Sequence, residues 1–256
     1  MRKKNTGKPT ISHTQKKRLD ARLVELGLAQ SRARACALVL SGNVRVDDKV
    51  ITKAGFPIGE KSNVEVIGND NPYVSRGGVK LEGALDDFHI NVTNKVGLDA
   101  GASTGGFTDC LLCKGIKKVY AVDVGYGQFD WTLRNDPRVT LFERKNIRKI
   151  KPDDLPEKID IAVIDVSFIS LRLVLPPVTS LLKKGGEVLA LIKPQFEVGK
   201  GEVGKGGVVR DPEKRQHAVD EIVKFSEEKG FHVFGVKESK LQGPKGNIEY
   251  FLYATV

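Results

Sequence analysis

The sequence has few cysteines and no long apolar run. Its 256 residues include only three cysteines, at positions 36, 110 and 113. Three cysteines cannot build a disulfide framework, and the single Cys-x-x-Cys pair lacks the second pair of ligands that zinc needs. We therefore expect no metal and a reducing, cytoplasmic location. The longest apolar stretch, residues 159–182, is interrupted by charged residues and two prolines, so it cannot cross a bilayer as a helix. The basic residues 1–17 are not followed by the apolar block of a signal peptide, and we expect no membrane partner.

Acidic residues are scarce near the N-terminus. The whole chain has 42 Lys and Arg against 32 Asp and Glu, a formal net charge of +10, and residues 1–67 hold 14 and 6 of these. A basic surface of this kind attracts nucleic acid, and a solvated basic tail is the alternative interpretation.

The chain divides into a small N-terminal unit and a larger second unit. After a basic tail, residues 1–16, leucines at helical spacing predict one helix that ends at Gly27 and a second from Ser31 to Leu40. Short alternating segments predict strands at 44–46, 50–51 and 64–66. The polar, turn-rich residues 68–76 predict a linker, so the expected domains are residues 17–67 and 77–256.

The N-terminal motifs resemble the S4-type RNA-binding domain. The residues that carry the resemblance are Arg18-Leu19-Asp20, Gly27, Ser31-Arg32, Ala35, Gly42 and Val44-Arg45-Val46. The resemblance implies that paired helices and adjoining strands present basic side chains to structured RNA, namely Arg18, Arg22, Arg32, Arg34 and Arg45. Such side chains neutralise phosphates without reading sequence strongly. We expect Arg76, at the end of the linker, to contact RNA as well.

Apolar segments and helical patterns alternate after residue 77, which predicts a three-layer α/β fold. The expected strands are 96–99, 119–123, 160–165, 187–192, 232–237 and 248–255, with one helix at 107–114 and another between Asp211 and Gly230. Phe129 and Trp131, at helical spacing near Leu133, are expected to be core residues rather than groups that stack on bases.

A glycine-rich turn, residues 100–106, follows the first of these strands. Glycines let the backbone approach a nucleotide at a helix N-terminus, in a dinucleotide site or in an S-adenosylmethionine site, and Asp123 would serve ribose hydroxyls in either. Two features favour S-adenosylmethionine: Asp99 would repel a pyrophosphate but suits a cationic cofactor, and the last two strands match the hairpin that ends a methyltransferase sheet. The expected cofactor residues are Asp99, Gly101, Ser103, Gly105, Phe107, Asp123 and, on spacing alone, Asn146.

Four ionisable residues stand where a purely structural role is strained. Asp165 and Lys193 end apolar strands, Lys80 follows Ser75-Arg76-Gly77-Gly78, and Glu249 is expected inside the last strand. Ligands bind at the carboxyl ends of strands in α/β sheets, so we expect these side chains to converge. Each one alone could equally form a surface ion pair.

This set resembles the Lys-Asp-Lys-Glu tetrad of the FtsJ-like 2′-O-ribose methyltransferases, and the chain from Lys17 onward resembles the TlyA, or hemolysin A-like, family. The most specific motifs are Ser75–Leu81, Leu98–Thr108, Asp165–Ser170 and Ile192–Glu197. The resemblance implies an S-adenosylmethionine-dependent methyltransferase (Rossmann-like) domain that modifies cytidine ribose in ribosomal RNA, free or within a ribosomal subunit. Lys193 would deprotonate or polarise the hydroxyl, while Asp165 and Glu249 orient the two lysines.

Several alternatives remain open at this stage. The chain could be a non-catalytic ribosomal RNA-binding or assembly factor, or, as the old family name suggests, a membrane-active hemolysin, although no segment has membrane dimensions. The glycine-rich stretch 198–209, with Lys200, Lys205 and Arg210, is either a mobile loop or a cover over RNA. The sequence identifies neither the modified nucleotide nor the oligomeric state.

Overall fold

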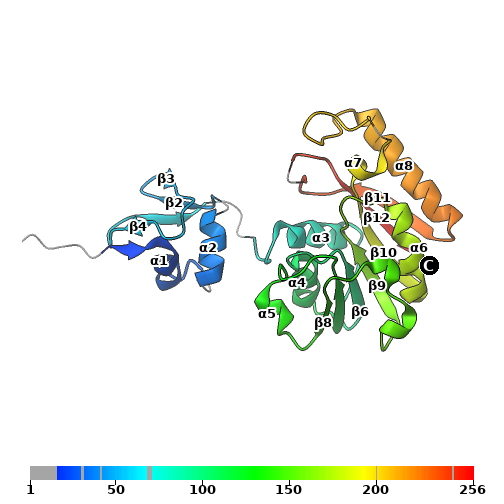
Figure 1. The fold of residues 1–256 in the computed structure, drawn as a ribbon, viewed down its shortest axis with the longest axis horizontal. Coiled ribbons are helices and arrows are strands. Elements are labelled where there is room, and N and C mark those ends of the chain that lie inside the picture. The colour runs from blue at the N-terminus through cyan, green and yellow to red at the C-terminus, as the bar shows by residue number, and fades with distance from the viewer. Residues whose placement is uncertain (1–15, 30–31, 41, 68–70, 200, 244) are drawn as a thin grey trace, which may run out of the picture. The chain divides into compact units, whose positions relative to one another are not determined.

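The computed structural model describes residues 16–29, 32–40, 42–67, 71–199, 201–243 and 245–256 (Figure 1). The chain forms two compact units, Met1–Asp70 and Asn71–Val256. The expected tail, residues 1–16, therefore lies outside the described residues except for Lys16, and Lys200 lies outside them too.

The described residues of the first unit form two helices and two small sheets. Its elements are β1 (Lys17–Arg18), α1 (Leu19–Glu25), α2 (Arg32–Leu40), β2 (Val44–Val46), β3 (Lys49–Val50), β4 (Pro57–Ile58) and β5 (Val64–Val66). Strands β3, β2 and β5 form one sheet in that order, and β1 pairs with β4. Leu19, Leu23 and Val39 of the helices pack with Val44 and Ile58 to form the core. The turn between β2 and β3 places Asp47 and Asp48 at positive φ, which is typical of a two-residue hairpin turn.

The second unit is a seven-stranded sheet with the order β11-β12-β10-β9-β6-β7-β8. The strands from β10 to β8 are parallel, and β12 is antiparallel to both of its neighbours. The strands are β6 (Val96–Ala100), β7 (Lys118–Val122), β8 (Val139–Phe142), β9 (Ile159–Ile164), β10 (Leu182–Ile192), β11 (His232–Glu238) and β12 (Tyr250–Thr255). The helices are α3 (Arg76–Asp87), α4 (Gly106–Cys113), α5 (Trp131–Arg134), α6 (Leu175–Leu181), α7 (Pro194–Glu197) and α8 (Pro212–Glu228), with 3₁₀ turns at Ile147–Lys149, Pro152–Asp154 and Leu171–Leu173.

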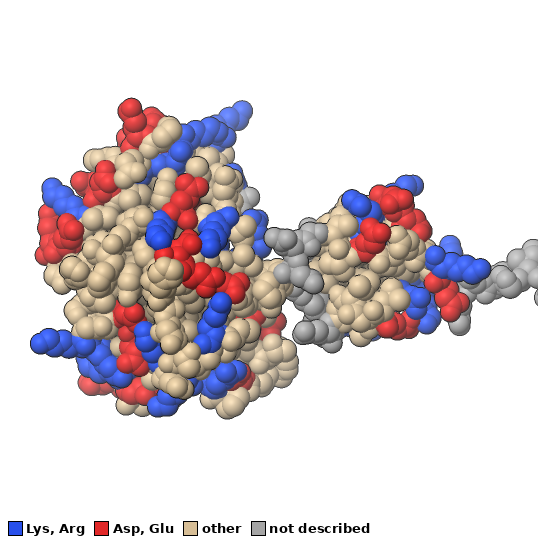
Figure 2. Space-filling model, turned by 180° about the vertical axis from the view of Figure 1, so that it is seen from behind, with Lys and Arg blue, Asp and Glu red and all other residues tan. Residues whose placement is uncertain are grey.

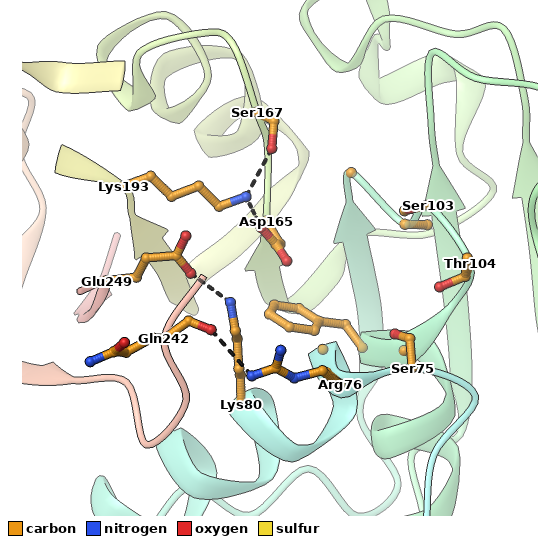
Figure 3. A pocket seen from close by; sticks show the side chains of 15 residues that line it. Ser75, Arg76, Lys80, Ser103, Thr104, Asp165, Ser167, Lys193, Gln242 and Glu249 are labelled. Carbon is orange, nitrogen blue, oxygen red and sulfur yellow. Dashed lines mark hydrogen bonds and ion pairs between the residues drawn. The ribbon is translucent and has the colours of Figure 1, made fainter. Parts of the chain in front are cut away.

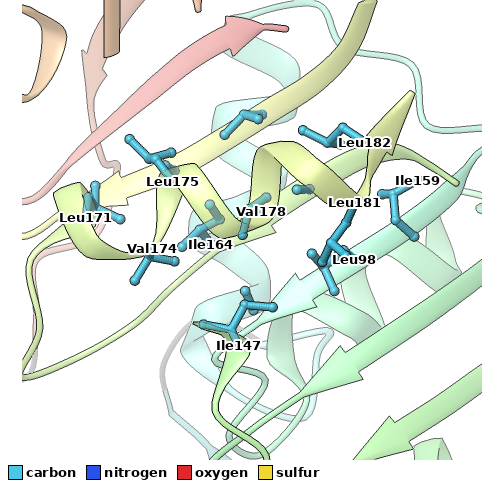
Figure 4. Close-up of a cluster of buried hydrophobic side chains, with 14 of the residues drawn as sticks. Leu98, Ile147, Ile159, Ile164, Leu171, Val174, Leu175, Val178, Leu181 and Leu182 are labelled. Atoms are coloured by element: carbon cyan, nitrogen blue, oxygen red, sulfur yellow. The ribbon is translucent and has the colours of Figure 1, made fainter. Parts of the chain in front are cut away.

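Alternate residues of the central strands pack on opposite faces of the sheet. In β9, Ile161 and Val163 pack in the cluster that contains α3 and α4 side chains, whereas Ala162 and Ile164 pack with α6 and α8. Figure 4 shows this second cluster, in which Leu175 and Val178 of α6 face Ile164. Two apolar faces are expected for a parallel sheet that helices cover on both sides, so the predicted three-layer fold is confirmed.

The second unit begins earlier than the sequence indicated. The expected linker, residues 68–76, overlaps it from Asn71 onward. Tyr73 is buried, and the backbone N–H of Val74 donates to Asp109 Oδ2 of α4 over 2.7 Å. Residues 71–76 thus belong to the second unit instead of forming a linker, and α3 begins at Arg76.

Candidate active site

The carboxyl ends of three neighbouring strands bring functional side chains together. Ile164 of β9 is paired in register with Ala100 of β6 and with Ala190 of β10. Asp165 follows β9 directly and Lys193 follows β10 directly. Because parallel strands end at the same edge of a sheet, these two side chains lie side by side, as the sequence predicted.

Two lysine–carboxylate pairs occupy this edge (Figure 3). Lys193 Nζ lies 2.5 Å from Asp165 Oδ1 and donates to Ser167 Oγ over 2.9 Å. Lys80 Nζ donates to Glu249 Oε2 over 2.6 Å. All four charged side chains line one cavity of about 420 Å³, which we call the lysine cavity. Each lysine thus has a carboxylate partner, and Arg76 adds a third positive charge to the lining of the cavity.

Glu249 is the most buried member of this set, with its side chain only 2% exposed. It stands immediately before β12 rather than inside it, opposite the end of β10 where Tyr250 pairs with Ile192. Gln195 Nε2 lies 3.5 Å from the other carboxylate oxygen. A Cβ at Gly243 would lie 2.6 Å from Glu249 Oε1, so a larger residue there would push against the carboxylate.

The glycine-rich turn forms the opposite wall of the lysine cavity. Gly101 and Gly105 have φ values of +93° and +97°, a conformation that favours glycine. A Cβ at Gly101 would lie 2.4 Å from the carbonyl oxygen of Asp165. The turn therefore approaches the end of β9 as closely as backbone atoms allow.

A second cavity, of about 450 Å³, adjoins the first and shares Gly101, Ser103, Asp165 and Ser167 with it. We call it the Asp123 cavity. Asp123 accepts hydrogen bonds from the backbone N–H groups of Ser103 and Gly125, over 2.7 and 2.6 Å. Asn146 also lines the Asp123 cavity, and its side chain accepts from the N–H of Arg148. Phe107 lines the lysine cavity.

Two expected cofactor residues do not line either cavity. Gly105 faces Leu133 and Phe129 instead, since a Cβ there would meet both side chains. Asp99 is fully buried in β6, where Thr108 Oγ1 donates to Asp99 Oδ2 over 2.7 Å. Among the described residues, Asp99 Oδ1 has no hydrogen-bond partner. Burial raises the pKa of Asp99 to about 7, and the negative charges of Asp165 and Asp123 add to the effect.

The arginines predicted to bind RNA are mostly paired with carboxylates. Asp20 of α1 is buried and accepts from Arg18 over 3.0 and 2.9 Å and from Arg32 over 3.1 Å. These arginines hold the pKa of Asp20 well below its usual range. Arg22 pairs with Glu25 and Arg45 with Glu65, at 3.0 and 3.8 Å.

The guanidinium groups of Arg18 and Arg32 nevertheless remain accessible, with side chains 58% and 63% exposed. Figure 2 shows blue and red side chains interspersed over the face that it draws. The side chain of Arg34 is outside the described residues. Arg76 belongs to the second unit, where it lines the lysine cavity and its Nη2 lies 3.5 Å from the carbonyl oxygen of Gln242.

Exposed aromatic side chains are the main departure from the sequence prediction. Phe129 is buried as expected, but Trp131 is 72% exposed, so its assignment to the core was wrong. Phe168 is 90% exposed, has a φ of +64° and contacts Phe196 with a centroid separation of 5.1 Å. It lines the Asp123 cavity, although the sequence marked it only as part of the motif Asp165–Ser170 and predicted no role for it. Ser167 and Gln242 were missed as well, because neither carries a charge at a strand end.

Neither a metal centre nor a membrane span is found among the described residues. No cluster of three or more His, Cys, Asp or Glu is arranged there to hold a metal ion. No helix in the part of the chain that the structure describes is long and apolar enough to cross a membrane.

Comparison with known proteins agrees with this geometry. Residues 73–255 match the FtsJ-like methyltransferase family, and residues 17–64 match the S4 domain. The chain belongs to the FtsJ-like methyltransferase family. This methyltransferase is 47% identical over 237 residues to the 16S/23S rRNA (cytidine-2′-O)-methyltransferase TlyA of Mycobacterium tuberculosis, and the match covers 92% of this chain and 88% of the relative.

Solved structures share the fold of this chain. "Putative hemolysin from Streptococcus thermophilus" superposes with a TM-score of 0.74 at 40% identity, and covers 94% of this chain and 89% of that one. An S-adenosylmethionine dependent methyltransferase from Mesorhizobium loti shares the fold alone, with a TM-score of 0.51 at 15% identity over 69% of this chain and 98% of that one. The expected S4 and methyltransferase folds and the methyltransferase activity are therefore confirmed.

The residues present fit the methyl donor that such a family implies. S-adenosylmethionine combines an adenosine with a cationic methionine end. The Asp123 cavity offers a carboxylate and the apolar side chains of Ile147, Val166 and Ile169, which suit a ribose and an adenine. The glycine-rich turn extends from the Asp123 cavity to the lysine cavity. The methyl group would therefore be transferred beside the two lysines.

Proposed function

We propose that this protein transfers a methyl group from S-adenosylmethionine to the 2′-hydroxyl of a cytidine ribose in ribosomal RNA. The observation that carries the proposal is the pair of lysine–carboxylate contacts in one cavity beside the glycine-rich turn. The name of the M. tuberculosis relative supports cytidine and ribosomal RNA as substrate. The S4 domain supports RNA, alone or in a ribosomal subunit, as the partner.

The cofactor residues divide by cavity in this proposal. Gly101, Ser103 and Phe107 surround the methionine end, Asp123 binds the ribose hydroxyls, and Asn146 contacts the adenine edge. When bound, the cofactor supplies an electrophilic methyl group on a sulfonium. Asp99 acts from beneath the turn: it holds Thr108 in α4, so that it supports the loop rather than touching the ligand.

Lys193 is the residue that we assign to the reacting hydroxyl. A ribose hydroxyl is a very weak acid, so its proton must leave while the new O–C bond forms. We assign to Lys193 Nζ the deprotonation or polarisation of this hydroxyl, and Asp165 and Ser167 hold the amine in place. Positioning of this kind matters because the hydroxyl must approach the methyl group in line.

Lys80 and Glu249 act as a buried positioning pair. Their side chains are 9% and 2% exposed, so removing one partner would leave an uncompensated charge and cost about 3–5 kcal/mol of stability. Lys193 is therefore the cleaner residue to substitute when catalysis is tested.

In this proposal, the target base stacks on the aromatic side chain of Phe168. Unpaired bases stack on aromatic side chains in many RNA-binding sites. The ring is 90% exposed and stands one residue after Ser167, which contacts Lys193.

The product identifies the reaction. The purified protein is incubated with labelled S-adenosylmethionine and, in separate reactions, with free ribosomal RNA and with each ribosomal subunit from a strain that lacks the gene. The RNA is then digested to nucleosides. We expect label in 2′-O-methylcytidine; label in a base, or none in any RNA, would refute the proposal.

Cofactor binding separates this function from the alternatives. A non-catalytic RNA-binding factor would give no heat on titration with S-adenosylmethionine, whereas we expect saturable binding at one site. A membrane-active hemolysin would release dye from liposomes at physiological salt, and we expect no release.

A further inference from the structure

Three basic side chains of the second unit gather at a place outside both cavities of the proposed active site. Arg210 precedes α8, Arg215 lies in its first turns, and Lys245 belongs to the loop between β11 and β12. They line a separate open groove together with Val208, Val209, Gln242, Gly246 and Ile248. We call it the basic groove.

The two loops that form the basic groove are fastened to each other. Figure 1 shows the loop between α7 and α8 beside the loop that joins β11 and β12. Asn247, which is 4% exposed, accepts from the N–H of Val209 over 3.1 Å and donates to the carbonyl oxygen of Gly207 over 2.9 Å. These hydrogen bonds hold the two loops together, so the groove is a defined feature of the fold.

The positive charge of the basic groove is not neutralised by the protein. No Asp or Glu lines it, and among the ion pairs of the described residues none involves Arg210, Arg215 or Lys245. Arg215 Nη1 donates instead to the carbonyl oxygens of Val209 and Arg210, over 3.1 and 2.7 Å. Neighbouring Lys214, by contrast, lies 3.7 Å from Glu202.

The basic groove and the lysine cavity have one lining residue in common. Gln242 lines both of them. Lys245 also lines a further cavity that it shares with Lys193 and Glu249. The groove therefore neighbours the place where the proposed function puts the ribose.

We propose that Arg210, Arg215 and Lys245 bind a backbone phosphate of the RNA strand, next to the nucleotide that is methylated. The inference rests on the proposed function, which places that nucleotide in the lysine cavity. Guanidinium and ammonium groups without carboxylate partners suit a phosphate, to which charge-assisted hydrogen bonds are strong. The groove thereby fixes the register of the strand, since phosphate contacts position a nucleic acid without reading its sequence.

The test compares two full-length double variants that remove the same charge. Arg210→Gln with Lys245→Gln removes two groove cations. Lys224→Gln with Lys229→Gln removes two exposed cations at the far end of α8. Binding of a ribosomal RNA transcript is measured over a range of salt concentrations, together with KM for methylation of that transcript and the affinity for S-adenosylmethionine.

We expect the groove variant to raise KM for RNA and to weaken RNA binding by roughly tenfold or more. Its slope of log affinity against log salt should become shallower by about 0.7 for each phosphate that the variant no longer neutralises. Affinity for S-adenosylmethionine should stay unchanged. The single variant Arg215→Gln should act in the same direction, and circular dichroism would show whether its backbone hydrogen bonds also hold the fold.

Equal RNA affinity and salt slope in the two double variants would overturn the inference. Inorganic phosphate tests the other source of the same chemistry. If it binds the wild type but not the groove variant while both bind RNA equally, the groove is a site for free anions and not for RNA. If the wild type methylates no RNA, the proposed function fails, but the salt slopes still show separately whether the groove contacts RNA.

Discussion

Asp99 and Lys193 are charged residues from strands of one sheet, yet the fold treats them differently. Asp99 lies inside β6 and is fully buried, whereas Lys193 follows the end of β10 and reaches a cavity. Asp99 accepts one side-chain hydrogen bond, from Thr108, and has an oxygen without a partner among the described residues. Its pKa of about 7 follows mainly from burial.

The raised pKa of Asp99 predicts a pH-dependent stability. Between about pH 4 and pH 7, the folded state binds more protons at this group than the unfolded state does, so this contribution to stability falls as pH rises. Asp99→Asn removes the titration. We expect the free energy of unfolding of the variant, relative to wild type, to shift in favour of the variant from pH 4 to pH 7 and then to level off. Urea unfolding at several pH values measures this difference, and a difference that does not change with pH would contradict the burial argument.

Asp165 and Lys193 could be predicted from the sequence because each follows an apolar strand directly, whereas Lys80 in α3 and Glu249 before β12 do not. The side chains of Asp165 and Lys193 are in contact because β9 and β10 end at the same edge of the sheet. Phe168 and Gln242 could not be predicted in the same way, since an aromatic or amide side chain in a loop has no periodicity to place it. Trp131 was placed wrongly because it stands between Phe129 and Leu133, which are buried, while α5 is a single turn that exposes the Trp131 side chain to solvent.

Among the elements, the glycine-rich turn makes the sharpest demand on residue type. Gly101→Ala would bring a Cβ to 2.4 Å from the Asp165 carbonyl oxygen and strain a φ of +93°. Gly185→Ala is the matched control, because Gly185 has a φ of +73° but no atom within 4 Å of the added Cβ.

We expect Gly101→Ala to lower stability by about 1–3 kcal/mol more than the control, since overpacking adds to the backbone strain. It should also weaken S-adenosylmethionine binding, because the turn must move. Thermal unfolding and calorimetric titration of both variants measure these effects. Equal behaviour of the two variants would show that the close approach to β9 is unimportant.

Helix and strand signals predicted most of the second unit, and the exceptions have physical reasons. Asp211 accepts from the N–H of Glu213 and so caps α8 as expected. Strand β8 was not predicted: its four residues, Val139–Phe142, are all half-buried and lie at the sheet edge, so they do not form the fully buried apolar run that marks a central strand. The start of the second unit was misplaced because the contacts of Tyr73 and Val74 with the rest of the unit are tertiary and leave no local pattern.

At the scale of the whole molecule, much of the positive charge among residues 1–67 is paired with carboxylates. Four of the 14 basic residues among positions 1–67 belong to the tail, residues 1–15. In the described part of the first unit, each of four arginines has a carboxylate partner; they are Arg18, Arg22, Arg32 and Arg45. Net charge alone could not predict these pairs, since several of them join side chains on different helices or strands.

Removing the first unit should separate RNA binding from cofactor binding. We expect a chain that starts at Asn71 to bind S-adenosylmethionine as the full chain does, because both cavities lie within the second unit. Its affinity for ribosomal RNA should fall, with a salt dependence that is shallower by about 0.7 in slope for each single-strand phosphate that it no longer binds. Filter binding and calorimetry measure the two affinities. Loss of both would mean that the second unit does not fold or function alone.

The rate of methyl transfer by Lys193→Ala tests the central assignment most directly. Lys184→Ala is the control, since Lys184 is an exposed lysine at the opposite end of the same strand. We predict that Lys193→Ala lowers the single-turnover rate on ribosomal RNA by about 10²–10⁴-fold, while affinity for S-adenosylmethionine stays within about twofold of wild type. A Lys193→Ala enzyme that methylates RNA as fast as the Lys184→Ala control would contradict the account.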